Sequence, residues 1–172
     1  MVVVLENRIY VYNFADLRLI DAIDTCFNPK GICALSPDPN ISVLAAPDKQ
    51  KGHVKITIYE KNHNYTIQAH QSSVSSLALN FSGTLLATAS DKGTLIRIFS
   101  TEDGSPLQEV RRGTDKAEIY SIAFDKFSRW IACSSDKGTI HIFTVSKNLA
   151  KITLSDENAN TDNPNGQVQE DM

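Results

Sequence analysis

The sequence lacks several features that would place it in a specialised class of protein. It has only three cysteines (Cys26, Cys33 and Cys133) and no Cys-x-x-Cys pair, so we expect free thiols in a reducing compartment and no disulfide framework. No apolar run approaches the roughly 18–20 residues of a membrane span. Met1–Leu5 has no basic start of the kind that opens a signal peptide. These features favour a cytosolic or nuclear protein with one ordinary domain in its 172 residues.

Positive charge is also scarce. The formal net charge is −3, and no broad basic field favours general nucleic-acid binding, so an anion site has to be built locally from a few well-placed groups. Residues 147–172 carry two basic and five acidic residues. Because residues 146–172 are polar and show no alternation, we expect an acidic, disordered tail there.

Signatures of enzymes and metal sites are missing as well. His53 and His63 have no cluster of partner ligands, so the sequence predicts no metal site and no cofactor. There is no nucleophile elbow, and no glycine-rich phosphate loop precedes a helix. We therefore expect a protein that is not an enzyme.

What the sequence does contain is a repeat. Asp91–Thr94 recurs as Asp136–Thr139, an offset of 45 residues, and the flanking segments match as well. Each copy contains short runs of β-branched and aromatic residues separated by turn residues. The Asp-Lys-Gly turns are hairpin signals, because glycine adopts a positive φ without strain. Leu95–Phe99 is one residue longer than its counterpart in the next copy, which predicts a bulge in that strand. A period of 45 residues with about four strands is typical of a β-propeller blade.

The repeat predicts an all-β fold: a β-propeller of four-stranded antiparallel blades over residues 1–145. Only about three and a half blades fit into this length, whereas closed propellers have four to eight. The chain looks like the middle of a longer propeller. The predicted units are a partial blade at 2–25, full blades at 31–69 and 73–112, and a partial blade at 118–145.

A pair of arginines ends the outer strand of the third unit, in Val110-Arg111-Arg112-Gly113. Neighbouring strand residues project to opposite sides, so Arg111 and Arg112 are placed to serve two separate anion pockets. Gly113 lets the backbone turn and approach a ligand closely. The other interpretation is structural, with both arginines in surface ion pairs or bonded to carbonyls of the blade.

Residues 2–145 resemble the PROPPIN family, the WIPI-type seven-bladed propellers that bind phosphoinositides in autophagy. The resemblance rests on the arginine pair, on the repeated segments at 92–99 and 134–143, and on the matches at 28–33 and 69–72. Val110 stands where the family usually has Phe or Leu. The resemblance implies a chain with about half of an expected seven blades.

The same resemblance implies two phosphoinositide sites. The first would comprise His70, Thr88, Ser90, Gly93, Thr94, Arg97 and Arg111. The second would comprise Arg112, Gly113, Ser135, Thr139 and His141. The implied ligands are phosphatidylinositol 3-phosphate and the 3,5-bisphosphate, bound peripherally at phagophore assembly sites or at endosomal or vacuolar membranes. The implied partners are the lipid-transfer protein of autophagy and other autophagy factors, with no nucleic acid.

Several of these residues also have plainer interpretations. Thr94 and Thr139 are ordinary strand formers after a turn, and His70 stands where WD-type repeats place a structural histidine. His141 alternates with Ile140 and Ile142 and so faces away from them, which favours an exposed, ligand-facing position. At the level of the whole chain, the alternatives are a protein-binding WD-repeat scaffold without lipid recognition and a truncated product without function.

Overall fold

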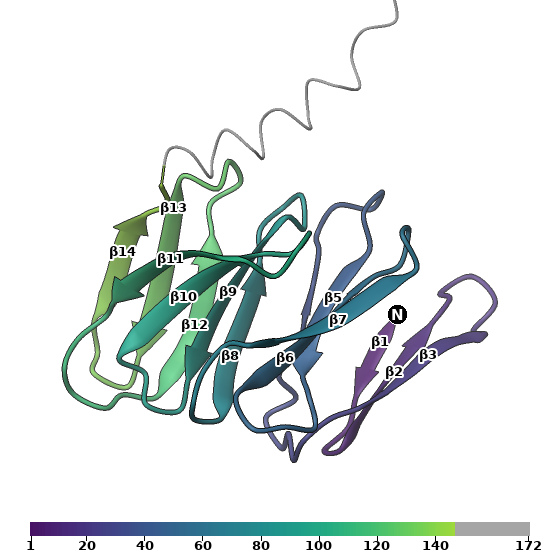
Figure 1. Ribbon diagram of the computed structural model, residues 1–172, viewed down its shortest axis with the longest axis horizontal. Coiled ribbons are helices and arrows are strands. Elements are labelled where there is room, and N and C mark those ends of the chain that lie inside the picture. The colour runs from purple at the N-terminus through teal and green to yellow at the C-terminus, as the bar shows by residue number, and fades with distance from the viewer. Residues whose placement is uncertain (147–172) are drawn as a thin grey trace, which may run out of the picture.

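The computed structural model describes residues 1–146, and these form fourteen β-strands in four antiparallel sheets without a helix. The acidic tail expected at 146–172 lies, apart from Ser146, outside the described residues. The sheets follow one another along the chain as blades set side by side (Figure 1). This confirms the all-β, partial-propeller prediction. Within residues 1–146 no helix is long and apolar enough to cross a membrane.

Each sheet is a meander in which consecutive strands are neighbours. The first and second sheets are β1 (Val2–Val4), β2 (Arg8–Tyr12) and β3 (Leu19–Asp24), then β4 (Ala34–Leu35), β5 (Val43–Pro47), β6 (His53–Ile58) and β7 (His63–Gln68). The third and fourth are β8 (Val74–Leu79), β9 (Leu85–Ser90), β10 (Leu95–Ser100) and β11 (Pro106–Arg111), then β12 (Ile119–Phe124), β13 (Trp130–Ser135) and β14 (Ile140–Thr144).

The predicted bulge lies in a different strand from the one expected. Ile98 of β10 pairs with Gln108, but the next residue, Phe99, pairs with Pro106, so the extra residue is Leu107 of β11. The bulge brings Leu107 onto the same side as Val110, three residues later, and both pack on the apolar cluster between the third and fourth sheets. The gain from this packing explains why the irregularity lies in the outer strand.

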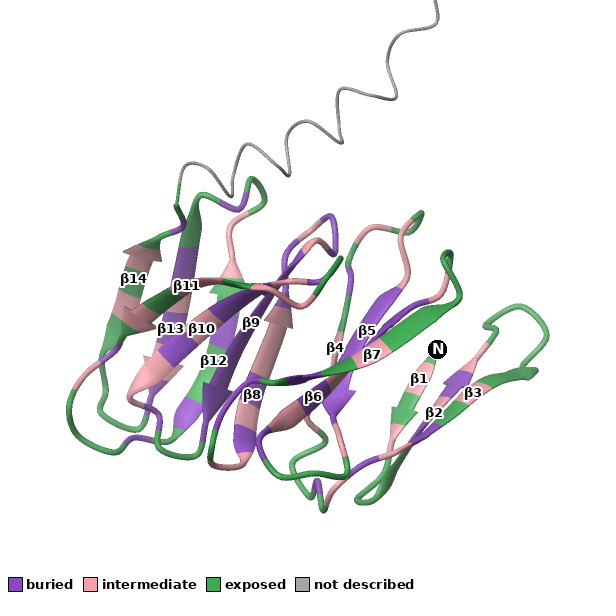
Figure 2. Cartoon of the chain, viewed as in Figure 1, coloured by how far each residue is buried: buried purple, intermediate pink, exposed green. Residues whose placement is uncertain are grey.

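Three apolar clusters fill the spaces between successive sheets. Ile9 and Leu44 belong to the cluster between the first two sheets, Ile56 and Leu86 to the next, and Ile98, with Ile131 and others, to the last. Burial of such a side chain contributes roughly 1.5–3 kcal/mol, so the sheets are held together mainly by their faces. In Figure 2 the buried positions are concentrated in strands such as β5 and β9, which are buried along their whole length.

The outward faces of the two terminal sheets remain open. On the fourth sheet Trp130, Ile140 and Ile142 are exposed, and on the first sheet Val3 is exposed. Figure 2 shows the exposed positions on β14 and β1. These apolar side chains have no neighbouring sheet within residues 1–146, whereas the equivalent side chains of the third sheet are covered by the fourth.

Candidate functional site

The two arginines project from the end of β11 toward different sheets. Arg111 lies opposite Leu95 and Val110 lies opposite Ile96 in the β10–β11 register. Directly opposed residues share a face of the sheet. Ile96 packs in the cluster between the third and fourth sheets, so Arg111 projects from the other face, toward the second sheet. Arg112, the next residue, is buried and lies near the fourth sheet: burial raises the pKa of the Cys133 thiol there, and the Arg112 charge partly offsets that rise.

A hollow of about 210 Å³ lies on the Arg111 side of the third sheet. We call it the first hollow. Its wall combines an imidazole, hydroxyl groups, an amide, an ammonium group and a guanidinium. The lining residues are His70, Gln71, Ser72, Ser90, Lys92, Thr94, Leu95 and Arg97.

Hydrogen bonds fix the floor of the first hollow. His70 Nε2 lies 2.9 Å from the fully buried Thr88 Oγ1. Arg97 donates from Nη1 to the Ala69 carbonyl at 2.7 Å and from Nε to Glu109 Oε2 at 2.8 Å. These bonds tie the loop that follows β7 to β9 and β10. His70 is therefore both the structural histidine of the plainer interpretation and part of the wall of the hollow.

The environment of His70 keeps its ring neutral. Burial, together with the nearby positive charge of Arg97, lowers the pKa of His70 from 6.5 to about 4. The imidazole therefore carries no charge at neutral pH and interacts with Thr88 and the hollow through hydrogen bonds alone. Positive charge in this hollow comes from other residues.

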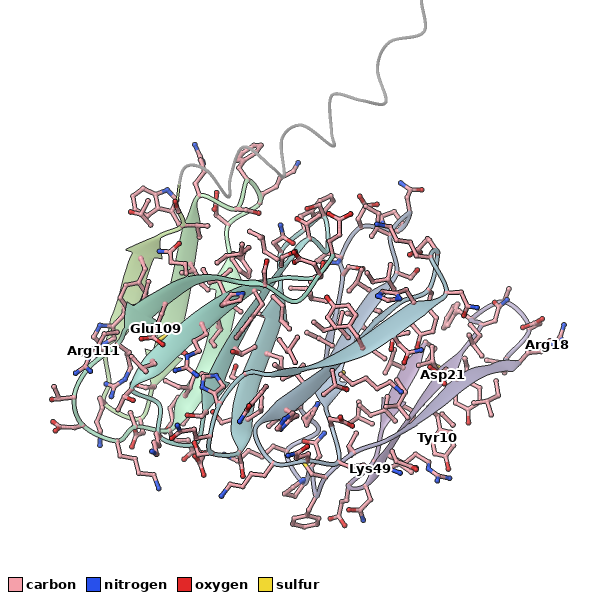
Figure 3. All side chains as sticks on the ribbon, in the orientation of Figure 1. Tyr10, Arg18, Asp21, Lys49, Glu109 and Arg111 are labelled. Carbon is pink, nitrogen blue, oxygen red and sulfur yellow. The ribbon has the colours of Figure 1, made fainter. Side chains whose placement is uncertain are left out.

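Two cations on this face of the third sheet, one in the wall of the hollow and one beyond it, are not engaged by neighbours. Within residues 1–146, the exposed side chains of Lys92 and Arg111 make no hydrogen bond or ion pair, whereas Arg97 is held by Glu109 and Ala69. Figure 3 shows Arg111 close to Glu109 at the end of β11. Lys92 is not among the ligands predicted from the sequence, although it lies in the repeated tetrad beside Gly93. The available positive charge is thus carried by Lys92 and Arg111.

The structure brings most of the first predicted set together. His70, Ser90, Thr94 and Arg97 line the hollow, and Thr88 lies below it. Gly93 forms the turn with φ of +64°, and a Cβ there would lie 1.9 Å from the Ala117 carbonyl oxygen, so only glycine fits. Arg111 is not part of the wall of the hollow, but it projects from the same face of the sheet as Leu95.

The second predicted set is less enclosed. Ser135 is buried, Thr139 is exposed, and Thr139 Oγ1 lies 3.1 Å from His141 Nε2. The His141 ring stacks on Phe143 at an interplanar angle of 8°. Gly113 has an ordinary φ, and a Cβ there would meet nothing within 4 Å, so the fold itself does not require glycine at this position.

Arg112 is the member of the second set with the most contacts. It is 8% exposed, its Nε donates to the Gly93 carbonyl at 2.6 Å, and its Nη2 donates to the Asp115 carbonyl. Two of its three nitrogens are thus engaged by backbone carbonyls, as the structural interpretation of the arginine pair expected. Arg111 has no such bonds within the described chain.

Comparison with known proteins gives a consistent result. The PROPPIN family profile matches residues 1–162. Autophagy-related protein 18e of Arabidopsis thaliana is 46% identical over 143 residues, covering 83% of this chain and 38% of that protein. Autophagy-related protein 18 of Mycosarcoma maydis is 41% identical, covering 85% of this chain and 37% of that protein.

Solved structures show the same fold. Hsv2 of Kluyveromyces marxianus superposes with a TM-score of 0.75 at 30% identity, covering 86% of this chain and 47% of that one. A structure of KlAtg21 in complex with the coiled coil of AgAtg16 superposes with a TM-score of 0.71 at 28% identity. The chain spans less than half the length of the curated relatives it matches. The repeat, the propeller sheets and these matches together show that the chain belongs to the PROPPIN family, whose members are autophagy-related phosphoinositide-binding proteins.

Proposed function

We propose that this chain binds membranes by recognising the phosphorylated headgroup of phosphatidylinositol 3-phosphate, or of the 3,5-bisphosphate, in the first hollow. The observation that carries the proposal is the composition of that hollow: Ser90, Thr94, Lys92 and Arg97 converge on one small space, and Arg111 projects from the same face of the sheet. Membrane binding of this kind involves no chemical transformation.

The groups present match the chemistry of a phosphorylated inositol. A phosphate accepts hydrogen bonds from the Lys92 ammonium and the Arg111 guanidinium, and charge-assisted bonds of this kind contribute roughly 1.5–3 kcal/mol each. The hydroxyls of Ser90 and Thr94 and the neutral His70 ring pair with ring hydroxyls, which both donate and accept. The carboxylate of Glu109 pairs with Arg97 and adds negative charge beside the hollow. It therefore disfavours a ligand whose negative charge exceeds the positive charge of Lys92 and Arg111.

The second predicted set would form a weaker site. Arg112 has only Nη1 without a hydrogen-bond partner in the described chain. His141 lies on β14, the last described strand, and Thr139 directly precedes that strand. Two modest sites on one rigid rim act together at a membrane surface, because occupying one raises the effective concentration of lipid at the other. The proposed locations are phagophore assembly sites and endosomal or vacuolar membranes, where the chain is peripherally bound.

Protein partners are a further part of the proposal. KlAtg21 is a structural neighbour that was solved with the coiled coil of AgAtg16, which supports a coiled-coil autophagy factor as one class of partner. The lipid-transfer protein of autophagy remains a second proposed partner, based on the family resemblance.

Co-sedimentation with vesicles tests the proposal. Vesicles containing phosphatidylinositol 3-phosphate are compared with vesicles of equal charge made with phosphatidylserine, using the wild-type chain and the Arg111→Thr, Arg112→Thr double variant. We expect wild-type binding to depend on the phosphoinositide and the variant to lose that dependence. Cooperative thermal unfolding of both proteins verifies that they are folded.

Two results would favour the alternatives. Equal binding of the wild-type chain to both kinds of vesicle, in a folded protein, would favour a protein-binding scaffold without lipid recognition. Absence of cooperative unfolding in the wild-type chain would favour a truncated product without function.

A further inference from the structure

The turn between β9 and β10 is held by hydrogen bonds from the loop at 112–117. Three successive carbonyls of this turn each accept a backbone or side-chain hydrogen bond. Ala117 N donates to Lys92 O at 3.1 Å, Arg112 Nε donates to Gly93 O at 2.6 Å, and Arg112 N donates to Thr94 O at 2.9 Å. The turn and the 112–117 loop therefore form one unit.

Arg112 supplies two of these three bonds and also fixes the loop itself. Its Nη2 donates to the Asp115 carbonyl, so one planar guanidinium joins the turn to the far side of the loop. The fork geometry of arginine allows both bonds from one rigid plane, whereas the single ammonium of lysine is a point donor on a flexible stem. The side chain is buried, which makes these bonds stronger than exposed ones.

The fit between turn and loop leaves no room for adjustment. A Cβ on Gly93 would lie 1.9 Å from Ala117 O, which shows that the two backbones touch at this point. The residues on either side of Gly93 are Lys92 and Thr94, and both line the first hollow. A displacement of the loop therefore moves two lining residues of the first hollow directly.

We propose that Arg112 is a positioning residue for the first hollow: its guanidinium holds the Lys92–Thr94 turn in the geometry that presents an ammonium and a hydroxyl to a phosphate. This inference rests on the proposed function for the identity of the ligand. It differs from the assignment of Arg112 to a separate second site, because it makes binding in the first hollow depend on an arginine that projects away from it.

The binding test uses isothermal titration of the full 172-residue chain with dibutanoyl phosphatidylinositol 3-phosphate, a soluble short-chain lipid. The binding step that is weakened in Thr94→Ala is assigned to the first hollow. The binding step that is weakened in Thr139→Ala is assigned to the second set. We expect Arg112→Lys, which keeps the charge but loses the fork, to weaken the Thr94-dependent step about tenfold. We also expect Arg112→Lys and Thr94→Ala to be non-additive in the double variant.

Two binding results would overturn the inference. In one, Arg112→Lys retains wild-type affinity, which would show that charge alone suffices. In the other, Arg112→Lys changes only the step that Thr139→Ala changes and leaves the Thr94-dependent step intact, which would assign Arg112 to the second set.

Amide hydrogen exchange provides a readout that does not need a ligand. In Arg112→Lys we expect the Ala117 amide, which donates to Lys92, to exchange at least tenfold faster, with the Ile98 amide in β10 unchanged. Unchanged exchange at Ala117 would contradict the inference. Faster exchange at Ile98 as well would also contradict it, because Arg112 would then support the fold as a whole. If the wild-type chain does not bind the short-chain lipid, the proposed function fails, and the exchange data still decide the role of Arg112.

Discussion

The third and fourth sheets are built from the same repeat, yet equivalent residues in them have different environments. Ile98 and Ile142 occupy matching positions, but Ile98 is fully buried and Ile142 is 65% exposed. Arg97 and His141 also match: Arg97 bonds to the loop after β7, whereas His141 bonds to Thr139, just before its own strand. The strand sequence thus sets which face of the sheet is apolar. Whether that face is buried depends on the presence of a neighbouring sheet. Of these two sheets, only the third is covered on both faces by neighbouring sheets within residues 1–146.

The largest expected difference between the two sheets is in stability. Ile98→Ala should lower the free energy of unfolding by about 2–5 kcal/mol, since it removes a fully buried side chain and leaves a cavity. Ile142→Ala should change it by less than about 0.5 kcal/mol, because the side chain is mostly in water. Chemical denaturation of both variants measures this. Equal losses would show that the outward face of the fourth sheet is covered in solution.

The buried histidine of the third sheet should make the protein sensitive to acid. The pKa of His70 is about 4 in the folded chain and near 6.5 when unfolded, so the unfolded state takes up the proton first as the pH falls. Stability should therefore be complete above pH 6.5 and fall by about 3 kcal/mol as the pH drops to 4. His141, at the matching place of the fourth sheet, is half-buried and serves as the control position.

Denaturation curves between pH 4 and 7 provide the measurement. His70→Gln should flatten the dependence in this range, while His141→Gln should leave it in place. The aspartates with lowered pKa values, such as Asp24 and Asp125, stabilise the fold above their unfolded value of 3.8, and this stabilisation is lost mainly below pH 4, so it adds little to the slope between pH 4 and 7. A slope that persists unchanged in His70→Gln would contradict this account of the histidine.

The two predicted sets of residues should differ in how much each contributes to lipid affinity. Arg111→Thr should lower the affinity for dibutanoyl phosphatidylinositol 3-phosphate by about 10- to 100-fold, because it removes a charge-assisted hydrogen bond to phosphate. Thr139→Ala should cost about threefold or less, since it removes one exposed hydroxyl. Titration calorimetry compares the two. The reverse order of effects would place the stronger site at the fourth sheet.

A modest gain in affinity is expected from the carboxylate beside the first hollow. Glu109 pairs with Arg97 at 2.8 Å and competes with any bound phosphate for that guanidinium. Glu109→Gln should raise the affinity for the short-chain lipid up to about fivefold, the range expected for a partly exposed ion pair. Lower affinity in this variant would mean that Glu109 holds Arg97 in its binding geometry.

Much of the fold could be predicted from the sequence because the signals are local and repeated. The tetrads at 91–94 and 136–139, with alternating apolar residues on each side, indicate hairpins at a fixed period, and the structure has them. The position of the bulge could not be predicted in this way. It depends on Leu107 reaching an apolar cluster formed with another sheet, which is a tertiary contact.

The types of residue in the candidate site could largely be predicted from the sequence, whereas their contacts could not. The alternation of Arg111 and Arg112 followed from strand geometry, and the hydroxyls and His70 came from the family resemblance. The bonds of Arg112 to Gly93 and Asp115 carbonyls could not be foreseen, since they depend on the path of the 112–117 loop. Lys92 could not be predicted as a ligand, because a lysine in a turn is usually a solvated surface residue; its place in the hollow depends on the 69–72 loop, which packs beside it.

Chemical-shift mapping locates the bound headgroup most directly. Backbone amide resonances of the full chain are followed by NMR while dibutanoyl phosphatidylinositol 3-phosphate is added. The account predicts that the largest changes cluster at Gln71, Ser90, Lys92 and Thr94, around the first hollow, and that Arg111→Thr removes them. Changes of equal size in wild type and Arg111→Thr, or changes centred on the open face of the fourth sheet, would contradict it.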